Sequence, residues 1–108
     1  MSEIATLLRF GAPAVKEIAT QKLNVAALIS GEIFTSALTS GHSRKNLYIY
    51  NLTNASSGEV YIGPLGVTPL TGMVIKKGEW VDINIGGDLD FYLVAGGAGS
   101  NLRVMELA

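Results

Sequence analysis

The chain has 108 residues, of which 48% are hydrophobic and only 16% are charged, and its formal net charge at pH 7 is −1. This length fits one domain, and the small net charge gives no electrostatic basis for binding nucleic acid or an anionic membrane. The sequence has no cysteine, which excludes disulfides and thiolate metal sites. Because a typical soluble domain carries about 25% charged residues, we expect this chain to bury apolar surface against copies of itself or a larger partner.

Residues 1–20 are predicted to form an extended N-terminal arm. They lack a basic segment followed by a sustained apolar core, so we expect no signal peptide. No apolar run approaches the roughly 20 residues that a membrane-spanning helix needs. A short helix that starts at Pro13 is an alternative for part of this region. The apolar anchors predicted for the arm are Ile4, Leu7, Leu8 and Phe10.

From residue 21 onward, alternating apolar and polar residues predict a series of short strands. In the segment 46–52, Leu47 and Ile49 alternate with Tyr48 and Tyr50. In the segment 80–85, one side of the strand is predicted to carry Val81, Ile83 and Ile85, and the other side Trp80, Asp82 and Asn84. The predicted strands are 23–29, 32–38, 46–52, 59–63, 73–76, 80–85, 90–95 and 101–107.

Glycine-rich turns separate these strands. Residues 76–78 and 96–99 are predicted to be the tips of hairpins, and 86–88 is predicted to be another tight turn. Successive strands with such short links favour antiparallel pairing. The predicted fold is all-β, a single antiparallel β-sandwich or jelly-roll-like domain over residues 21–108 with an extended N-terminal arm at 1–20.

No residue set has the spacing of a catalytic, metal or cofactor site. His42 is the only histidine, which excludes zinc sites built from two or three histidines, and we interpret it as a solvated loop residue. The glycine cluster at 96–99 lacks the last glycine of the dinucleotide fingerprint. Asp82, Asp88 and Asp90 lack the spacing of a calcium-binding loop. We therefore predict no catalytic residue, no metal and no cofactor, and a protein that is not an enzyme.

Four aromatic residues suggest two other ligands. With the basic pairs at 44–45 and 76–77 they fit a single-strand nucleic-acid surface, but the net charge argues against it. Alternatively, their flat rings form a carbohydrate platform. Trp80 is also a candidate anchor of a protein interface. The four residues are Tyr48, Tyr50, Tyr61 and Trp80.

The segment 62–80 combines four glycines and two prolines with several apolar residues. The prolines and Gly63 interrupt strand pairing, so Leu65, Val67 and Leu70 are predicted to lie on a loop. Loops rarely expose apolar side chains unless something covers them. We therefore predict that these three residues belong to a contact surface for another subunit.

Several short strings spread over residues 44–107 resemble small β-rich bacteriophage virion structural proteins. The strings are LYIYN at 47–51, VYIG at 60–63, GVT at 66–68, GEWVDI at 78–83, FYLVA at 91–95 and LRVMEL at 102–107. The resemblance implies a head decoration, cement or head-fibre-base protein with no catalytic residues.

The same resemblance implies that the protein is made in the host cytoplasm and located in the virion. Its expected partners are the major capsid protein or other virion subunits, and it is expected to form a homo-oligomer, with a trimer favoured. The alternatives are a tail or connector component, or a host-surface adhesin that binds carbohydrate.

Overall fold

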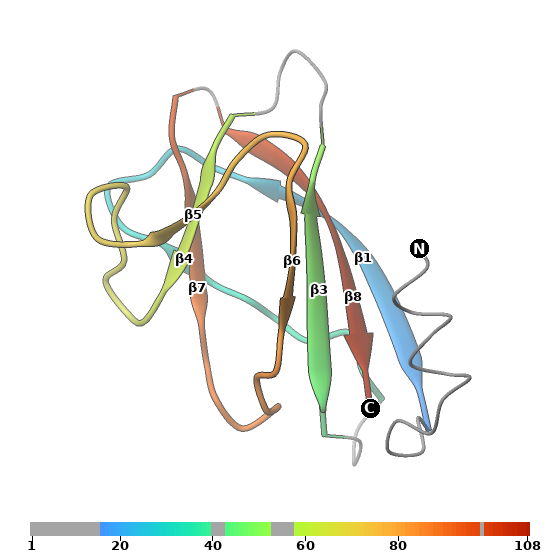
Figure 1. The fold of residues 1–108 in the computed structure, drawn as a ribbon. Helices are drawn as coiled ribbons and strands as arrows, with labels where there is room; N and C mark the ends of the chain where they lie inside the picture. The colour runs from blue at the N-terminus through green and yellow to red at the C-terminus, as the bar shows by residue number, and fades with distance from the viewer. Residues whose placement is uncertain (1–15, 40–42, 53–57, 98) are drawn as a thin grey trace.

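The computed structural model describes residues 16–39, 43–52, 58–97 and 99–108, and over these ranges the chain forms β-strands and no helix (Figure 1). The prediction of an all-β fold is confirmed. The strands are β1 (Ile18–Val25), β2 (Glu32–Ile33), β3 (Asn46–Asn51), β4 (Val60–Gly63), β5 (Met73–Ile75), β6 (Trp80–Ile83), β7 (Tyr92–Ala95) and β8 (Ser100–Leu107).

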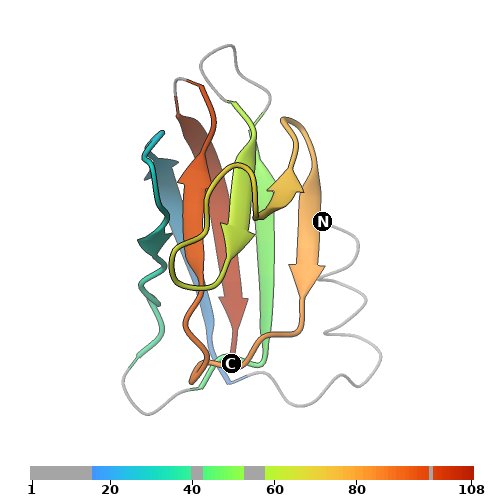
Figure 2. The ribbon, with the colours of Figure 1, turned by 90° about the vertical axis from the view of Figure 1, so that its left-hand side faces the viewer.

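The strands form two four-stranded antiparallel sheets, seen from two directions in Figures 1 and 2. The first sheet has the order β1-β8-β3-β6, and the second sheet has the order β2-β7-β4-β5. The longest pairing joins β1 to β8 along their whole length, from Ile18 opposite Leu107 to Val25 opposite Ser100.

The core lies between the two sheets. The first sheet contributes Leu47 and Ile49 of β3, and the second contributes Val60, Ile75 and Leu93, all of them buried. Fully burying a side chain of this size contributes about 1.5–3 kcal/mol. The inward residues follow the period of two expected of strands, which confirms the pattern on which the strands were predicted.

The aromatic residues Phe34 and Phe91 close one part of this core. Their rings stack with centroids 4.8 Å apart. Phe34 follows β2 and Phe91 precedes β7, and a backbone hydrogen bond of 3.0 Å from the Phe34 N–H to the Phe91 carbonyl joins the two segments. The predicted strand 32–38 has strand geometry only at Glu32–Ile33. The next residue, Phe34, still packs against the segment before β7.

The prediction of hairpins at 76–78 and 96–99 is wrong. Among the described strands, only β4 and β5 are both consecutive in the chain and hydrogen-bonded to each other. The turns at 76–79 and 86–89, and the link between β7 and β8, instead carry the chain from one sheet to the other. Glycine supports a tight turn in either case, since Gly78 and Gly97 have φ angles of 82° and 58°. A turn signal therefore locates the bend but does not identify the partner of the next strand.

The start of the sheet also differs from the prediction. Strand β1 begins at Ile18, so the last residues of the predicted arm, from Ile18 to Thr20, pair with β8. The alternative of a helix is excluded for the part that lies in β1. Residues 1–15, with the predicted anchors Ile4, Leu7, Leu8 and Phe10, lie outside the described residues.

Candidate functional site

The acidic residues of the described segments form no metal site: they contain no cluster of three or more His, Cys, Asp or Glu side chains. Asp82 lies exposed on β6 and accepts a hydrogen bond of 2.9 Å from the Asn46 side chain. Asp88 and Asp90 are exposed in the link between β6 and β7. His42 lies outside the described residues. Over the same ranges, no helix is long and apolar enough to cross a membrane.

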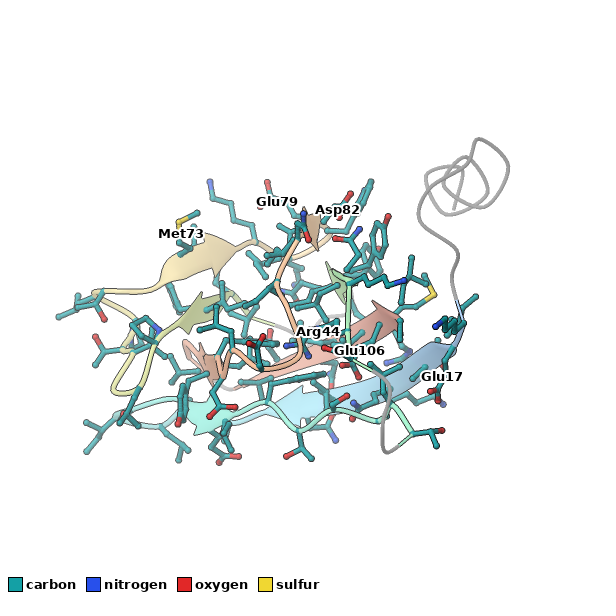
Figure 3. All side chains as sticks on the ribbon, turned by 90° about the horizontal axis from the view of Figure 1, so that it is seen from below. Glu17, Arg44, Met73, Glu79, Asp82 and Glu106 are labelled. Carbon is teal, nitrogen blue, oxygen red and sulfur yellow. The ribbon has the colours of Figure 1, made fainter. Side chains whose placement is uncertain are left out.

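A buried ion pair closes one end of the sandwich. The Arg44 Nη1 lies 2.9 Å from Glu106 Oε2, and both side chains are almost completely buried (Figure 3). The Arg44 Nε also donates to the Ile85 carbonyl at 3.0 Å, and Nη2 donates to the Gly86 carbonyl at 2.9 Å. The guanidinium group thereby holds the β6–β7 link against the start of β3.

The carboxylate of this pair is equally engaged. Glu106 Oε2 accepts from the Ser36 hydroxyl at 2.8 Å, and Oε1 accepts from the Ala37 N–H at 2.9 Å. The Arg44 guanidinium carbon also lies 5.4 Å from the centroid of the Phe91 ring, within the range of a cation–π contact. Because every one of these partners belongs to the fold itself, we interpret the pair as a structural lock.

Sequence reasoning missed this lock, although one signal was available. In the strand predicted at 101–107, Leu102 and Val104 face inward, and the alternation puts Glu106 on the same inward side. A charged residue at an inward position predicts a buried partner. The sequence contains no comparable signal for Arg44, which is 62 residues away from Glu106.

A second polar cluster lies at the opposite end of β3. The fully buried Asn51 donates through Nδ2 to the Gly58 carbonyl at 2.8 Å and to the Ile75 carbonyl at 2.9 Å. The Ser100 hydroxyl donates to the same Gly58 carbonyl and to Asn51 Oδ1. Asn51 therefore ties the first sheet to β5 of the second sheet. The side chains of Asn51 and of the Arg44–Glu106 pair are all hydrogen-bonded within the fold, so we interpret both clusters as structural.

The loop 64–72 lies on the outer face of the second sheet and corrects one prediction. Val67 is only 2% exposed, so it does not offer an apolar side chain to a partner. Its γ-carbons occupy a seat formed by glycines: a Cβ on Gly63 would lie 2.7 Å from Val67 Cγ2, and one on Gly72 would lie 2.8 Å from it. The Val67 carbonyl also accepts a 2.8 Å hydrogen bond from the Gly31 N–H. Val67 thus fixes the loop to the sheet.

The other two predicted loop residues are exposed, and two strand residues extend their surface. Leu65 is 78% exposed and Leu70 is 97% exposed. Ile33 on β2 and Val74 on β5 point outward, opposite the outward-facing Tyr92 and Tyr61, and are 48% and 41% exposed. We call Ile33, Leu65, Leu70 and Val74 the apolar face. Met73, at the start of β5, is also exposed (Figure 3), but it is opposite Ile62 and therefore lies on the other side of the sheet from Val74.

The outer face of the first sheet has a different character. The strand register places Lys22 of β1 opposite Arg103 of β8, Arg103 opposite Tyr50 of β3, and Tyr50 opposite Trp80 of β6. We call these four residues the cation–aromatic row. The row lines a groove on the sheet, and the Tyr48 ring stacks beside Trp80 with centroids 6.3 Å apart.

The predicted aromatic platform is therefore divided between the sheets. Tyr48, Tyr50 and Trp80 lie together on the first sheet, whereas Tyr61 lies on the outer face of the second. The Tyr61 hydroxyl donates to the Glu59 carboxylate at 3.0 Å, and this hydrogen bond raises the pKa of the phenol. Trp80 is 44% exposed, so it is available to a ligand or a protein partner.

The sequence matches no protein-family model, and no curated protein is significantly similar to it.

Proposed function

We propose that this protein is a non-catalytic structural component of a bacteriophage virion that binds the outside of the capsid and reinforces it. The observation that carries the proposal is the apolar face of Ile33, Leu65, Leu70 and Val74. Large exposed apolar patches on a small domain are typical of protein interaction sites. A capsid shell, with the same site repeated many times, would turn weak contacts of this kind into strong total binding.

The arrangement of the strands supports a jelly-roll fold. The orders β1-β8-β3-β6 and β2-β7-β4-β5 send nearly every connection from one sheet to the other. Double-sheet jelly rolls of eight strands are found in viral capsid and lectin domains. Fold alone does not assign function, so the proposal depends on the surface and on the resemblance of the sequence strings.

The apolar face is held ready for a partner. The Val67 seat and the Gly31–Val67 hydrogen bond fix the loop that presents Leu65 and Leu70. A contact surface that is already ordered loses less conformational entropy on binding. Burial of apolar surface contributes about 25 cal/mol per Å² before the costs of association.

Self-association is part of the proposal, with a closed trimer favoured. The apolar face reaches both edge strands of the second sheet, because Ile33 lies on β2 and Val74 on β5. These edges differ in charge: Glu32 is exposed on β2, and Lys76 and Lys77 are exposed just after β5. Edges of opposite charge favour a head-to-tail contact, which closes into a ring when the rotation permits. The predicted arm anchors Ile4, Leu7, Leu8 and Phe10 would add contacts to neighbouring subunits.

Native mass spectrometry and a particle-binding assay test the proposal with the double variant Leu65→Ser/Leu70→Ser. Each leucine buried at an interface contributes about 1.5–3 kcal/mol, so we expect each replacement to weaken assembly by about tenfold or more. Leu89→Ser is the control, since Leu89 is 60% exposed but belongs to the β6–β7 link and not to this face.

The proposal is wrong if the unmodified protein is strictly monomeric at micromolar concentration and also fails to bind assembled virions. Binding to isolated tails but not to tail-free heads would favour the tail or connector alternative. Equal losses in the double variant and in Leu89→Ser would show that the apolar face is not the contact surface.

A further inference from the structure

We infer that the cation–aromatic row on the first sheet is a binding site for an acidic saccharide, with a carboxylate of the sugar held by Arg103 and Lys22 and its ring on Tyr50 and Trp80. This site is separate from the proposed capsid contact, because the row and the apolar face lie on the outer sides of different sheets.

The two cations are placed where the fold gains nothing from them. Lys22 and Arg103 are directly opposite each other on β1 and β8, and both are exposed. Like charges at opposite positions of neighbouring strands destabilise a sheet. In the part of the chain that the structure describes, neither side chain forms an ion pair, and Arg103 donates only to the Leu102 carbonyl at 3.3 Å. An anion from outside the protein would compensate this charge.

The aromatic half of the row supplies two adjacent flat surfaces. Tyr50 and Trp80 are opposite each other on β3 and β6, and Trp80 is 44% exposed. The buried Tyr48 ring stacks against Trp80 at an interplanar angle of 30°, which supports the indole from the side. Aromatic rings provide a rigid apolar surface with two torsion angles each, so they lose little entropy on binding. The carbon–hydrogen face of a pyranose ring is a suitable partner for such a surface.

The spacing of the row fits a sugar that carries its charge at the edge of the ring. Neighbouring strands are about 4.8 Å apart, so Arg103 lies one strand away from Tyr50 and Lys22 lies one strand further. A pyranose ring placed on Tyr50 would bring a carboxylate at its edge over Arg103. Guanidinium groups bind carboxylates through two parallel hydrogen bonds, which adds geometric selectivity.

The same row is less suited to a nucleic acid strand. A strand needs a track of cations for successive phosphates, whereas this row has only Lys22 and Arg103. Asp82 lies in the adjoining row, opposite Tyr48, and would repel a second phosphate. The net charge of −1 for the whole chain gives no further attraction.

A glycan array and titration calorimetry test the inference. The array carries sialylated, uronic-acid and neutral glycans, and the titrations use trigalacturonic acid against its methyl ester and sialyllactose against lactose. We expect saturable binding of acidic glycans and weaker binding of the matched neutral ones. We expect Arg103→Gln to weaken binding by about tenfold or more, because it removes a charge-assisted hydrogen bond.

Two matched controls separate the row from the rest of the surface. Trp80→Ala should reduce binding of acidic glycans, whereas Tyr61→Ala on the second sheet and Lys77→Gln beside β5 should leave it unchanged. Unchanged thermal unfolding of Trp80→Ala and Arg103→Gln would show that the variants remain folded.

The inference is overturned if no glycan binds, if neutral glycans bind as well as acidic ones, or if Arg103→Gln binds as tightly as the unmodified protein. Selective binding of a single-stranded oligonucleotide in place of the glycans would also overturn it. The glycan and virion assays test separate proposals. The double variant Leu65→Ser/Leu70→Ser changes only the apolar face, so it should weaken virion binding and leave glycan binding intact.

Discussion

The two outer faces of this molecule are built from similar strands but have different surfaces. The first sheet presents on its outer face the charged and aromatic side chains of Lys22, Arg103, Tyr50 and Trp80. The second sheet is partly covered by the loop 64–72, and its exposed side chains are mainly apolar. The difference arises from the loop 64–72 between β4 and β5. Val67, packed against glycines, fixes this loop to the second sheet.

The two proposed binding sites lie on faces of different chemistry. A charged and aromatic face remains hydrated and selects a ligand through directed contacts. An apolar face gains free energy from burial and needs a partner of matching shape. The shared core holds both faces, and because they belong to different sheets we expect substitutions in one face to leave the other intact.

Loss of the buried Arg44–Glu106 pair should weaken the core that supports both faces. Arg44→Met leaves the buried Glu106 carboxylate without its ionic partner, so the free energy of unfolding should fall by about 3–5 kcal/mol. Urea unfolding followed by tryptophan fluorescence measures this change. The double variant Arg44→Met/Glu106→Leu should recover much of the loss, and an unchanged stability in the single variant would refute the structural role of the pair.

A substitution at Gly63 should disturb the loop 64–72 on the second sheet and leave the first sheet unchanged. Gly63→Ala places a Cβ 2.7 Å from Val67 Cγ2, so we expect a loss of about 1–3 kcal/mol from overpacking. The variant Gly63→Ala/Val67→Ala relieves this contact, and a double-mutant cycle should show a favourable coupling between the two sites. Additive losses would mean that Val67 does not occupy the glycine seat.

The like-charge pair of Lys22 and Arg103 on the first sheet can be tested by a reversal of one charge, for which we expect only a small change in stability. Lys22→Glu replaces a like-charge pair opposite Arg103 with an opposite-charge pair, which should stabilise the sheet by about 0.2–1 kcal/mol. Urea unfolding at low and high salt measures this gain, which should decrease as salt screens the charges. Lys22→Gln is the control for the loss of repulsion alone. A destabilised Lys22→Glu protein would argue against the register of β1 and β8.

The strands could be predicted from the sequence because alternation is a local pattern. The positions of Leu47, Ile49, Val81 and Ile83 followed from it directly. Their partners could not be predicted, since a glycine turn bends the chain in the same way within a hairpin and between sheets. The predicted hairpins were therefore wrong, although most of the strands themselves were right.

The surfaces were predictable only in part, for the same reason. Leu65 and Leu70 were correctly expected to be exposed, because prolines and glycines keep their segment out of the sheet. The burial of Val67 depends on Gly31, which is far away in the sequence and reaches it only in the folded protein. The row of Lys22, Arg103, Tyr50 and Trp80 likewise depends on the register of four strands.

Amide hydrogen exchange of the free protein and of the protein bound to virions would show which face contacts the capsid. We expect binding to slow exchange in the loop 64–72 and in β5, which carry most of the apolar face, and to leave β6 of the first sheet unchanged. Protection of β6 with no change in 64–75 would contradict the proposed capsid contact and assign it to the side of the cation–aromatic row.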